Sequence, residues 1–358
     1  MGIRKLFLFK RINFNIFEII INFRNRRKNI KIFLLFILSI IFLFCHFFEI
    51  FKINYNNNIF LDLKYANIIK NLNIENSNFA VIRRAFCPVC GLFSNYIVFL
   101  GCINEFLHKG FIPIIDLKSY ENVFNDFKAN KSNENPWEFF FYQPFDYKLK
   151  KIEKIAKKMQ YFECNTNNFR PCENIFLNKK ILNFWHIMSK NYIPIQNKIL
   201  LEAKNIYKRL FKDSHNILGI LMRGTDYIAK KPSGHPIPPN SSMVIKDIKN
   251  MNLKNNYDWL FISTEDDSIR EIFIKEFGHK LKFLFYKQIK YNYKNHEFLS
   301  LNKNIRGNLK YLKIYLINII ILSKCIDILS ANTSGAIGVF ILSNGFRYSK
   351  VYDLGYYT

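Results

Sequence analysis

The residues best suited to chemistry follow an apolar run in the second half of the chain. Residues 217–222 read Ile-Leu-Gly-Ile-Leu-Met, long enough for one buried parallel strand, and Arg223, Gly224, Thr225 and Asp226 follow directly. An arginine presents a rigid fork of donors that fits phosphate oxygens, and Asp226 can orient it or cap the next turn. Because ligands of open α/β sheets bind at the carboxyl ends of strands, the pattern predicts an anion site. A surface Arg–Asp pair is the alternative.

A second turn has the composition of a phosphate-binding helix start. The apolar run 326–330 feeds Asn332, Thr333, Ser334 and Gly335, and another apolar stretch follows them. The free N–H groups of a helix start bind phosphate without a cation. Ordinary helix capping by Ser and Thr is the alternative. The chain has neither Gly-x-Gly-x-x-Gly nor Gly-x-x-x-x-Gly-Lys-Ser/Thr, which argues against nucleotide sites of those two kinds.

The overall charge favours anionic partners. The 358 residues carry a net charge of +26, with lysine, asparagine and isoleucine spread through the whole chain. Such a balance attracts lipid head groups or nucleotide phosphates. We find no zinc-finger spacing, no RNA-recognition signature and no separable basic helix, so nucleic acid is not expected as a partner.

The seven cysteines are not expected to form a disulfide framework, because their number is odd and their spacing is irregular. The pair Cys87 and Cys90 forms a CxxC pattern that lacks the second pair of a zinc site. We therefore expect ordinary small buried side chains and no bound metal.

One segment has the length and composition of a transmembrane helix. Residues 32–51 are almost wholly apolar, and spanning a bilayer takes about 20 such residues. The tail 1–31 holds nine lysines and arginines and only Glu18 as an acid, so the positive-inside rule predicts a cytoplasmic N-terminus and a type II arrangement. The stretch 12–23 could instead lie on the membrane surface or pair as a hairpin, which would return the main domain to the cytoplasm.

The rest of the chain alternates short apolar runs with longer amphipathic stretches, which is typical of parallel α/β layers. After a stem over 52–75, we expect two Rossmann-like halves, 76–205 and 206–358, with a cleft between them. Helices are expected over residues 148–159, 194–211, 241–250, 311–324 and 336–342, and strands over residues 79–82, 112–115, 217–222, 259–263, 281–285 and 326–330.

Several short blocks, taken in order, resemble the fucosyltransferase superfamily, which includes α-1,6-, nodulation and protein O-fucosyltransferases. The closer resemblance is to bacterial members that act in polysaccharide biosynthesis. The resemblance covers roughly residues 80–356. The matching blocks are Gly-Leu-Phe-Ser-Asn at 91–95, Trp-Glu-x-x-Phe at 137–141, Arg-Gly-Thr-Asp-Tyr at 223–227, His-Pro-Ile-Pro-Pro at 235–239, residues 261–267, residues 326–338 and Asp-Leu-Gly at 353–355.

This resemblance implies a GT-B fold and an inverting, metal-independent transfer of a sugar to a glycan hydroxyl. The donor would be a GDP-sugar, with GDP-fucose as the family's donor. Arg223 would bind the β-phosphate, and Thr333 and Ser334 would contact the diphosphate. Gly91 and Asn95 would belong to a glycine-rich turn that faces the cleft.

The chain departs from the family pattern at three positions. Leu221 replaces a usual histidine, Gly224 replaces the second arginine of a pair, and Asn318 stands where relatives often carry an acid that contacts the nucleotide. These departures motivate an alternative: a GT-B-like membrane protein that only binds glycan or polyanion. For the general base that accepts the acceptor's proton, the candidates in order are His235, Asp116 and Glu138.

Overall fold

The computed structural model describes residues 77–125, 134–166, 175–284 and 307–358, apart from the side chains of Thr225 and Asp226. These residues belong to one compact unit, Asp62–Thr358. The predicted tail, transmembrane helix and stem lie outside the described residues. Within them, no helix is both long enough and apolar enough to span a membrane.

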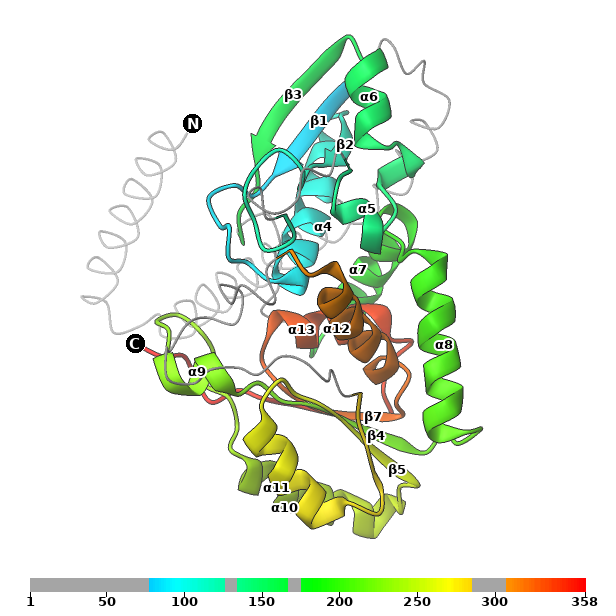
Figure 1. Ribbon diagram of the computed structural model, residues 1–358, viewed down its shortest axis with the longest axis vertical. Helices are drawn as coiled ribbons and strands as arrows, with labels where there is room; N and C mark the ends of the chain where they lie inside the picture. Colours follow the sequence, from blue (N-terminus) through cyan, green and yellow to red (C-terminus); the bar gives the residue numbers. More distant parts are fainter. Residues whose placement is uncertain (1–76, 126–133, 167–174, 285–306) are drawn as a thin grey trace, which may run out of the picture. The chain divides into compact units, whose positions relative to one another are not determined.

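A small parallel sheet is built from the first half of the described residues, with strand order β2-β1-β3 (Figure 1). Its strands are β1 (Asn78–Arg83), β2 (Ile112–Ile115) and β3 (Lys158–Glu163). Helix α4 (Leu92–His108) joins β1 to β2, and α5 (Trp137–Phe140), η2 (Pro144–Asp146) and α6 (Leu149–Ile155) lie between β2 and β3. The expected helix over 148–159 is therefore too long, because β3 begins at Lys158.

Two longer helices lead from this sheet to the next one. These are α7 (Lys179–Tyr192) and α8 (Asn197–Phe211). The side chain of Asn178 caps α7 by accepting hydrogen bonds from the N–H groups of Lys180 and Ile181. The predicted helix over 194–211 is found with a start three residues later.

The second sheet has five parallel strands in the order β6-β5-β4-β7-β8 (Figure 1). The strands are β4 (Ile217–Leu221), β5 (Trp259–Ser263), β6 (Leu281–Lys282), β7 (Asp327–Ala331) and β8 (Tyr348–Tyr352). The helices between them are α9 (Thr225–Lys230), α10 (Ser241–Asn255), α11 (Asp267–Phe277), α12 (Leu309–Leu322) and α13 (Ser334–Leu342). The chain reverses its direction of winding between β4 and β7, and such a switch point is where open α/β sheets bind ligands.

Helices cover both faces of the five-stranded sheet. Val244 and Ile248 of α10 and Ile269 and Phe273 of α11 form a core with one face, and α12 and α13 lie on the other (Figure 1). The core on the α12 and α13 side continues without a break into the small sheet, so both sheets share one hydrophobic cluster. The chain is thus an α/β protein with parallel sheets. Its division into two domains at residue 205 stays a prediction.

Two disulfides correct the expectation for the cysteines. Cys87 is bonded to Cys90 in the turn before α4, and Cys102 of α4 is bonded to Cys164, which follows β3. Among the described cysteines, Cys325 is free and buried. Spacing could not reveal the second pair, because the fold brings together two cysteines that are 62 positions apart.

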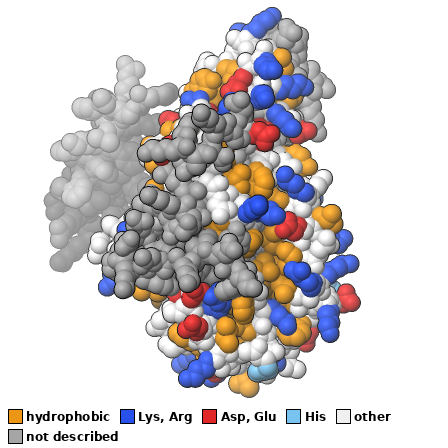
Figure 2. Space-filling model, viewed as in Figure 1, with side chains coloured by type: hydrophobic (Ala, Val, Ile, Leu, Met, Phe, Trp, Pro, Cys, Tyr) orange, Lys and Arg blue, Asp and Glu red, His pale blue; other side chains and the backbone are white. Residues whose placement is uncertain are grey.

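Basic side chains are scattered over the visible face rather than gathered on it (Figure 2). Lysines and arginines alternate with acids and apolar side chains across the described surface in that view. This distribution agrees with a lysine background spread through the sequence and does not indicate an extended polyanion track on that face.

Candidate functional site

The two turns singled out in the sequence follow neighbouring strands. Arg223 comes two residues after the end of β4, and α13 begins three residues after the end of β7. The two strands pair in parallel with Leu221 opposite Ser330, so their carboxyl ends meet at the same edge. The arginine and the helix start therefore adjoin the switch point between β4 and β7.

The Arg223 guanidinium is held in a partly open position. Its Nε lies 3.4 Å from Oε1 of Glu265, which follows β5, and its side chain is 29% exposed. Its Cζ lies 4.7 Å from the centre of the Tyr227 ring. The same Glu265 oxygen accepts a hydrogen bond from the Gly224 N–H at 2.9 Å. One carboxylate thus fixes both the arginine and the turn that carries it.

Gly224 cannot be replaced by a larger residue without movement of its neighbour. A Cβ on Gly224 would lie 2.6 Å from the Cβ of Asp266. Asp266 is buried and caps α11 by accepting hydrogen bonds from the N–H groups of Ser268 and Ile269. Any side chain at this position, an arginine included, would therefore require Asp266 to move.

The start of α13 combines a capping hydroxyl with a crowded glycine. Thr333 is the N-cap, and its Oγ1 accepts a hydrogen bond from the Ala336 N–H at 3.2 Å. Asn332, Thr333 and Ser334 are all half-buried. A Cβ on Gly335 would collide with the Tyr315 hydroxyl, so the glycine permits α12 to approach this turn.

Tyr315 of α12 connects the two turns. Its hydroxyl adjoins Gly335. Burial raises the pKa of this hydroxyl, and the positive charge of Arg223 works against that shift while Glu265 and Tyr227 add to it. The start of α13 thus contacts the Tyr315 hydroxyl, the charge of Arg223 acts on the same group, and the tyrosine stays protonated.

Buried polar atoms of α12 and β7 lack a hydrogen-bond partner within the described structure. These include Oδ1 of Asn318, one turn after Tyr315 on α12, and Oγ of Ser330, one residue before the end of β7. Buried acceptors without partners are uncommon in folded proteins, and they favour a ligand that completes them. Asn318 is also the residue that the sequence resemblance predicts to contact the nucleotide.

His235 is exposed beside the same arginine. Its ring meets the Tyr227 ring edge-on at 5.3 Å, and Tyr227 in turn lies against Arg223. The His235 loop pairs with the C-terminal segment: the Gly234 N–H donates to the Tyr357 carbonyl at 2.8 Å, and the Ile237 N–H donates to the Gly355 carbonyl at 2.9 Å. The imidazole is therefore held near the guanidinium and open to solvent.

The other two candidates for the base have structural contacts instead. Asp116 is only 1% exposed, pairs with Arg83 at 2.8 Å, and accepts hydrogen bonds from the N–H groups of Lys118 and Ser119. Glu138 accepts hydrogen bonds from the Leu149 N–H and from Gln143. Both carboxylates shape turns, and these contacts do not favour either one as the base.

The glycine-rich turn of the first half forms the start of α4. Asn95 is buried, and its Nδ2 donates to the carbonyls of Cys90 and Gly91, so the side chain stabilises the turn from within. Gly91 instead borders open space. The next residues reach the second half: Phe93 fills the gap left by Gly338 on α13 and contacts the Tyr315 ring at 5.8 Å.

Three further residues concern the candidate site: Asp226, which the sequence predicted, and Glu265 and Tyr315, which it did not. The Asp226 backbone lies in α9, and its side chain is outside the described residues. The sequence analysis includes Glu265 only within the block 261–267 and does not single out Tyr315. The position of Glu265 after a strand was a usable signal, since its neighbour Asp266 alone caps α11. Nothing in the sequence distinguishes Tyr315 from other aromatic residues.

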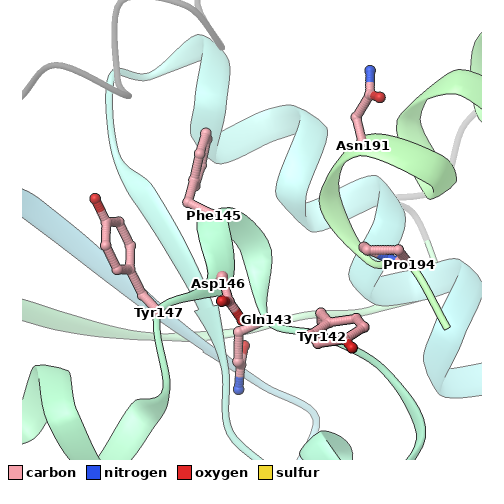
Figure 3. Close-up of a pocket in the computed structure, with 7 residues that line it drawn as sticks. All are labelled: Tyr142, Gln143, Phe145, Asp146, Tyr147, Asn191 and Pro194. Atoms are coloured by element: carbon pink, nitrogen blue, oxygen red, sulfur yellow. The ribbon is translucent and has the colours of Figure 1, made fainter. Parts of the chain in front are cut away.

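A separate hollow of about 510 Å³ lies elsewhere (Figure 3). It is lined by Tyr142, Gln143, Phe145, Asp146, Tyr147, Asn191 and Pro194, none of which belongs to the site above. Among the residues with described positions, no three His, Cys, Asp or Glu side chains gather as metal ligands would.

Comparison with known proteins finds similarity at the level of structure. No protein-family model and no curated protein matches the sequence. The structure is similar to NodZ α-1,6-fucosyltransferase soaked with GDP-fucose, at 11% identity and a TM-score of 0.44, over 75% of this chain and 93% of that one. It is also similar to POFUT1 in complex with GDP, at 10% identity and a TM-score of 0.42, over 77% of this chain and 98% of that one. Fucosyltransferases, which the sequence blocks resemble, are thus among the similar structures.

Proposed function

We propose that this chain is a membrane-anchored, inverting glycosyltransferase that transfers a sugar from a GDP-sugar to a glycan hydroxyl. Fucose or a related sugar is the proposed donor group, and the reaction needs no metal. The fold would be of the GT-B type, with Rossmann-like halves over residues 76–205 and 206–358. The bacterial, polysaccharide-forming branch of the family remains part of this proposal.

One observation carries the proposal. Arg223 and the start of α13 follow two adjacent parallel strands at the switch point of their sheet. The Tyr315 hydroxyl lies against Gly335 of that helix start, and the charge of Arg223 acts on the same hydroxyl. A guanidinium, a phenol hydroxyl and the N–H groups of a helix start are donors that suit phosphate oxygens. Their common location favours a diphosphate as the ligand.

The chemistry of transfer fits these groups. As the bond between the sugar and the diphosphate breaks, negative charge grows on the β-phosphate that leaves. A guanidinium already oriented by Glu265, 3.4 Å away, can stabilise that charge without reorganising. Each charge-assisted hydrogen bond contributes about 1.5–3 kcal/mol, so several donors around the diphosphate would lower the barrier substantially.

His235 is the proposed base for the acceptor. Its exposed imidazole lies one aromatic ring away from Arg223, so an acceptor hydroxyl near the donor sugar can reach it. Removing the proton from that hydroxyl makes its oxygen a better nucleophile at the anomeric carbon. Asn318, whose Oδ1 lacks a hydrogen-bond partner in the described structure, is the proposed contact for the base or ribose of the nucleotide.

The two disulfides support the type II arrangement. Disulfides persist in oxidising compartments and are rare where thiols are kept reduced. Cys102 and Cys164 are fully buried and Cys87 and Cys90 are half-buried, so both bonds belong to the folded domain. We therefore propose that residues 32–51 cross the membrane and that the catalytic part lies on the oxidising side.

A donor screen tests the enzymatic proposal. The full chain in detergent is incubated with a glycan mixture and each of a set of GDP- and UDP-sugars, and products are identified by mass spectrometry. We expect transfer from a GDP-sugar. Arg223→Gln should lower kcat by at least a hundredfold, and Arg209→Gln, which removes the same charge from an exposed position on α8, should not. Full activity in Arg223→Gln would overturn the proposal.

The crowding at Gly224 favours a second candidate. Because a second arginine would require Asp266 to move, the chain could be a degenerate member that binds glycan or polyanion without transferring sugar. Isothermal titration of the folded protein with GDP and GDP-fucose separates the two. Absence of binding to either would favour the binding protein.

A further inference from the structure

Arg84 is a buried arginine without a charge partner. It follows β1 directly and is only 4% exposed. Its Nη1 donates to the Ser94 carbonyl at 2.8 Å and to the Ser94 hydroxyl at 2.9 Å, and its Nε has no hydrogen-bond partner. The adjacent Arg83, by contrast, pairs with Asp116 at 2.8 Å. Among the described residues, no carboxylate forms an ion pair with Arg84.

Such an arrangement is unfavourable unless an anion completes it. Burial lowers the pKa of Arg84, which means that the surroundings disfavour its charge. An unpaired buried charge is rarely kept in a fold without a role. The carboxylate of Glu163, at the end of β3, accepts from the Ala85 N–H at 2.9 Å and forms no ion pair with Arg84. A bound anion would supply the missing counter-charge.

The start of α4 adds a second positive feature at the same place. Ser94, which holds Arg84, lies in the first turn of this 17-residue helix, and Gly91 caps it without any side-chain hydrogen bond. The positive end of the helix dipole and a guanidinium thus adjoin each other, although like charges repel. The backbone of Gly91 has an ordinary extended conformation, and an added Cβ would meet nothing within 4 Å. Neither the backbone nor the packing requires glycine there, which leaves room for a ligand.

The position in the fold repeats that of Arg223. In the order β2-β1-β3 the winding reverses between β1 and β3, so Arg84 follows the strand at the switch point of the small sheet. The first turn of α4 also reaches the other site, because Phe93 contacts Tyr315 and fills the gap at Gly338 of α13. One buried layer therefore joins Arg84 to the neighbourhood of Arg223.

We infer that Arg84 and the start of α4 bind the donor's diphosphate together with Arg223. In this arrangement Arg84 supplies the second guanidinium, which the turn after β4 could carry only if Asp266 moved. This inference rests on the proposed function, and it names a phosphate-binding residue in the first half of the chain.

Titration of the full chain in detergent tests the inference. Arg84→Gln, Arg84→Lys and the surface control Arg209→Gln are titrated with GDP, guanosine and inorganic pyrophosphate. We expect Arg84→Gln to lower the affinity for GDP and pyrophosphate at least tenfold and to leave guanosine binding unchanged. Arg84→Lys should lose less, and Arg209→Gln should match the wild type. The ligand-free melting temperature of Arg84→Gln should not fall, because an unpaired buried charge is removed.

Each other outcome is decisive. If Arg84→Gln binds GDP within twofold of the wild type while Arg223→Gln does not bind it, the inference is wrong and the proposed function stands. A third result is that the wild type binds pyrophosphate, Arg84→Gln does not, and the wild type neither binds GDP nor uses a GDP-sugar. In that case Arg84 binds phosphate, and the proposed donor is wrong. If Arg84→Gln weakens binding of a uronate-bearing glycan and not of GDP, the ligand is a carboxylate and the inference is wrong. A lower melting temperature with unchanged affinity assigns Arg84 a structural role only.

Discussion

The hydroxyl of Tyr315 lies where a methyl group on Gly335 would have to go. This contact brings α12 against the first turn of α13 at the edge where Arg223 also lies. The size of one side chain on α12 and the absence of one on α13 thus determine the shape of the proposed phosphate site.

Gly335→Ala should therefore distort the site, and Tyr315→Phe should relieve the distortion. Overpacking of this kind costs about 1–3 kcal/mol of stability, and we expect GDP affinity to fall with it. The double variant should recover most of the stability, because the phenyl ring lacks the clashing oxygen. Chemical unfolding and GDP titration of all four proteins form a double-mutant cycle. Additive effects of the two substitutions would show that the contact does not constrain the site.

Glu265→Ala should impair transfer more than binding of the nucleoside. The carboxylate orients Arg223 and accepts the Gly224 N–H, so its loss frees the guanidinium and loosens the turn. We expect kcat/KM to fall about 10–100-fold, which corresponds to about 1.4–2.7 kcal/mol. Glu265→Gln should be milder, since the amide oxygen can still accept from Gly224. The control is Glu271→Ala on the exposed side of α11. Equal activity of Glu265→Ala and this control would exclude an orienting role.

His235→Asn should lower kcat with little change in donor binding. Loss of a general base costs about 10²–10⁴-fold in rate, and the exposed position of His235 makes a folding defect unexpected. His279→Asn, at another exposed histidine, is the matched control. Steady-state kinetics and GDP titration separate the two effects. A parallel loss of GDP affinity would indicate that His235 acts by packing on Tyr227 and not as the base.

Replacing Cys102 and Cys164 by alanine should destabilise the first half of the chain. The bond closes a loop across 62 positions, and the chain-entropy relation gives about 4 kcal/mol for a loop of that length. Urea unfolding of the double variant measures the change. The half-buried Cys87–Cys90 bond closes a loop of only a few residues, so its removal should cost less. Equal stability of the Cys102/Cys164 variant and the wild type would argue against the buried disulfide.

Apolar runs were the most reliable guide to the fold. The strands at 79–82, 112–115, 217–222 and 259–263 were predicted within a residue or two, because a parallel strand covered on both faces reads as a continuous apolar stretch. Strands β3 and β8 were missed, since both lie at sheet edges and carry exposed polar residues. The edge strand β2 was readable because all four of its residues are buried, so exposed residues rather than edge position alone hide a strand.

Residue types at strand ends could single out only part of the candidate site. Arg223 and residues 332–335 stood out because their chemistry is local to one turn, and their binding role stays a prediction. Tyr315 and Arg84 did not stand out in the sequence, because their proposed roles depend on their neighbours in the folded structure. A tyrosine next to a glycine of another helix, or an arginine buried without an acid, has no signature in a single sequence. Asp116 shows the same dependence on surroundings, because an acid at a strand end can serve Arg83 as well as a substrate, and its role as the base stays a prediction.

Helix α13 packs against three other helices. Its residues from Gly335 to Ile341 are all buried, and it contacts α4, α7 and α12. A ligand bound at the first turn of α13 would therefore restrict the motion of the whole helix and of the helices packed against it. Amide hydrogen exchange should slow in α4 and α7 when nucleotide binds, although neither helix would lie wholly within reach of the nucleotide.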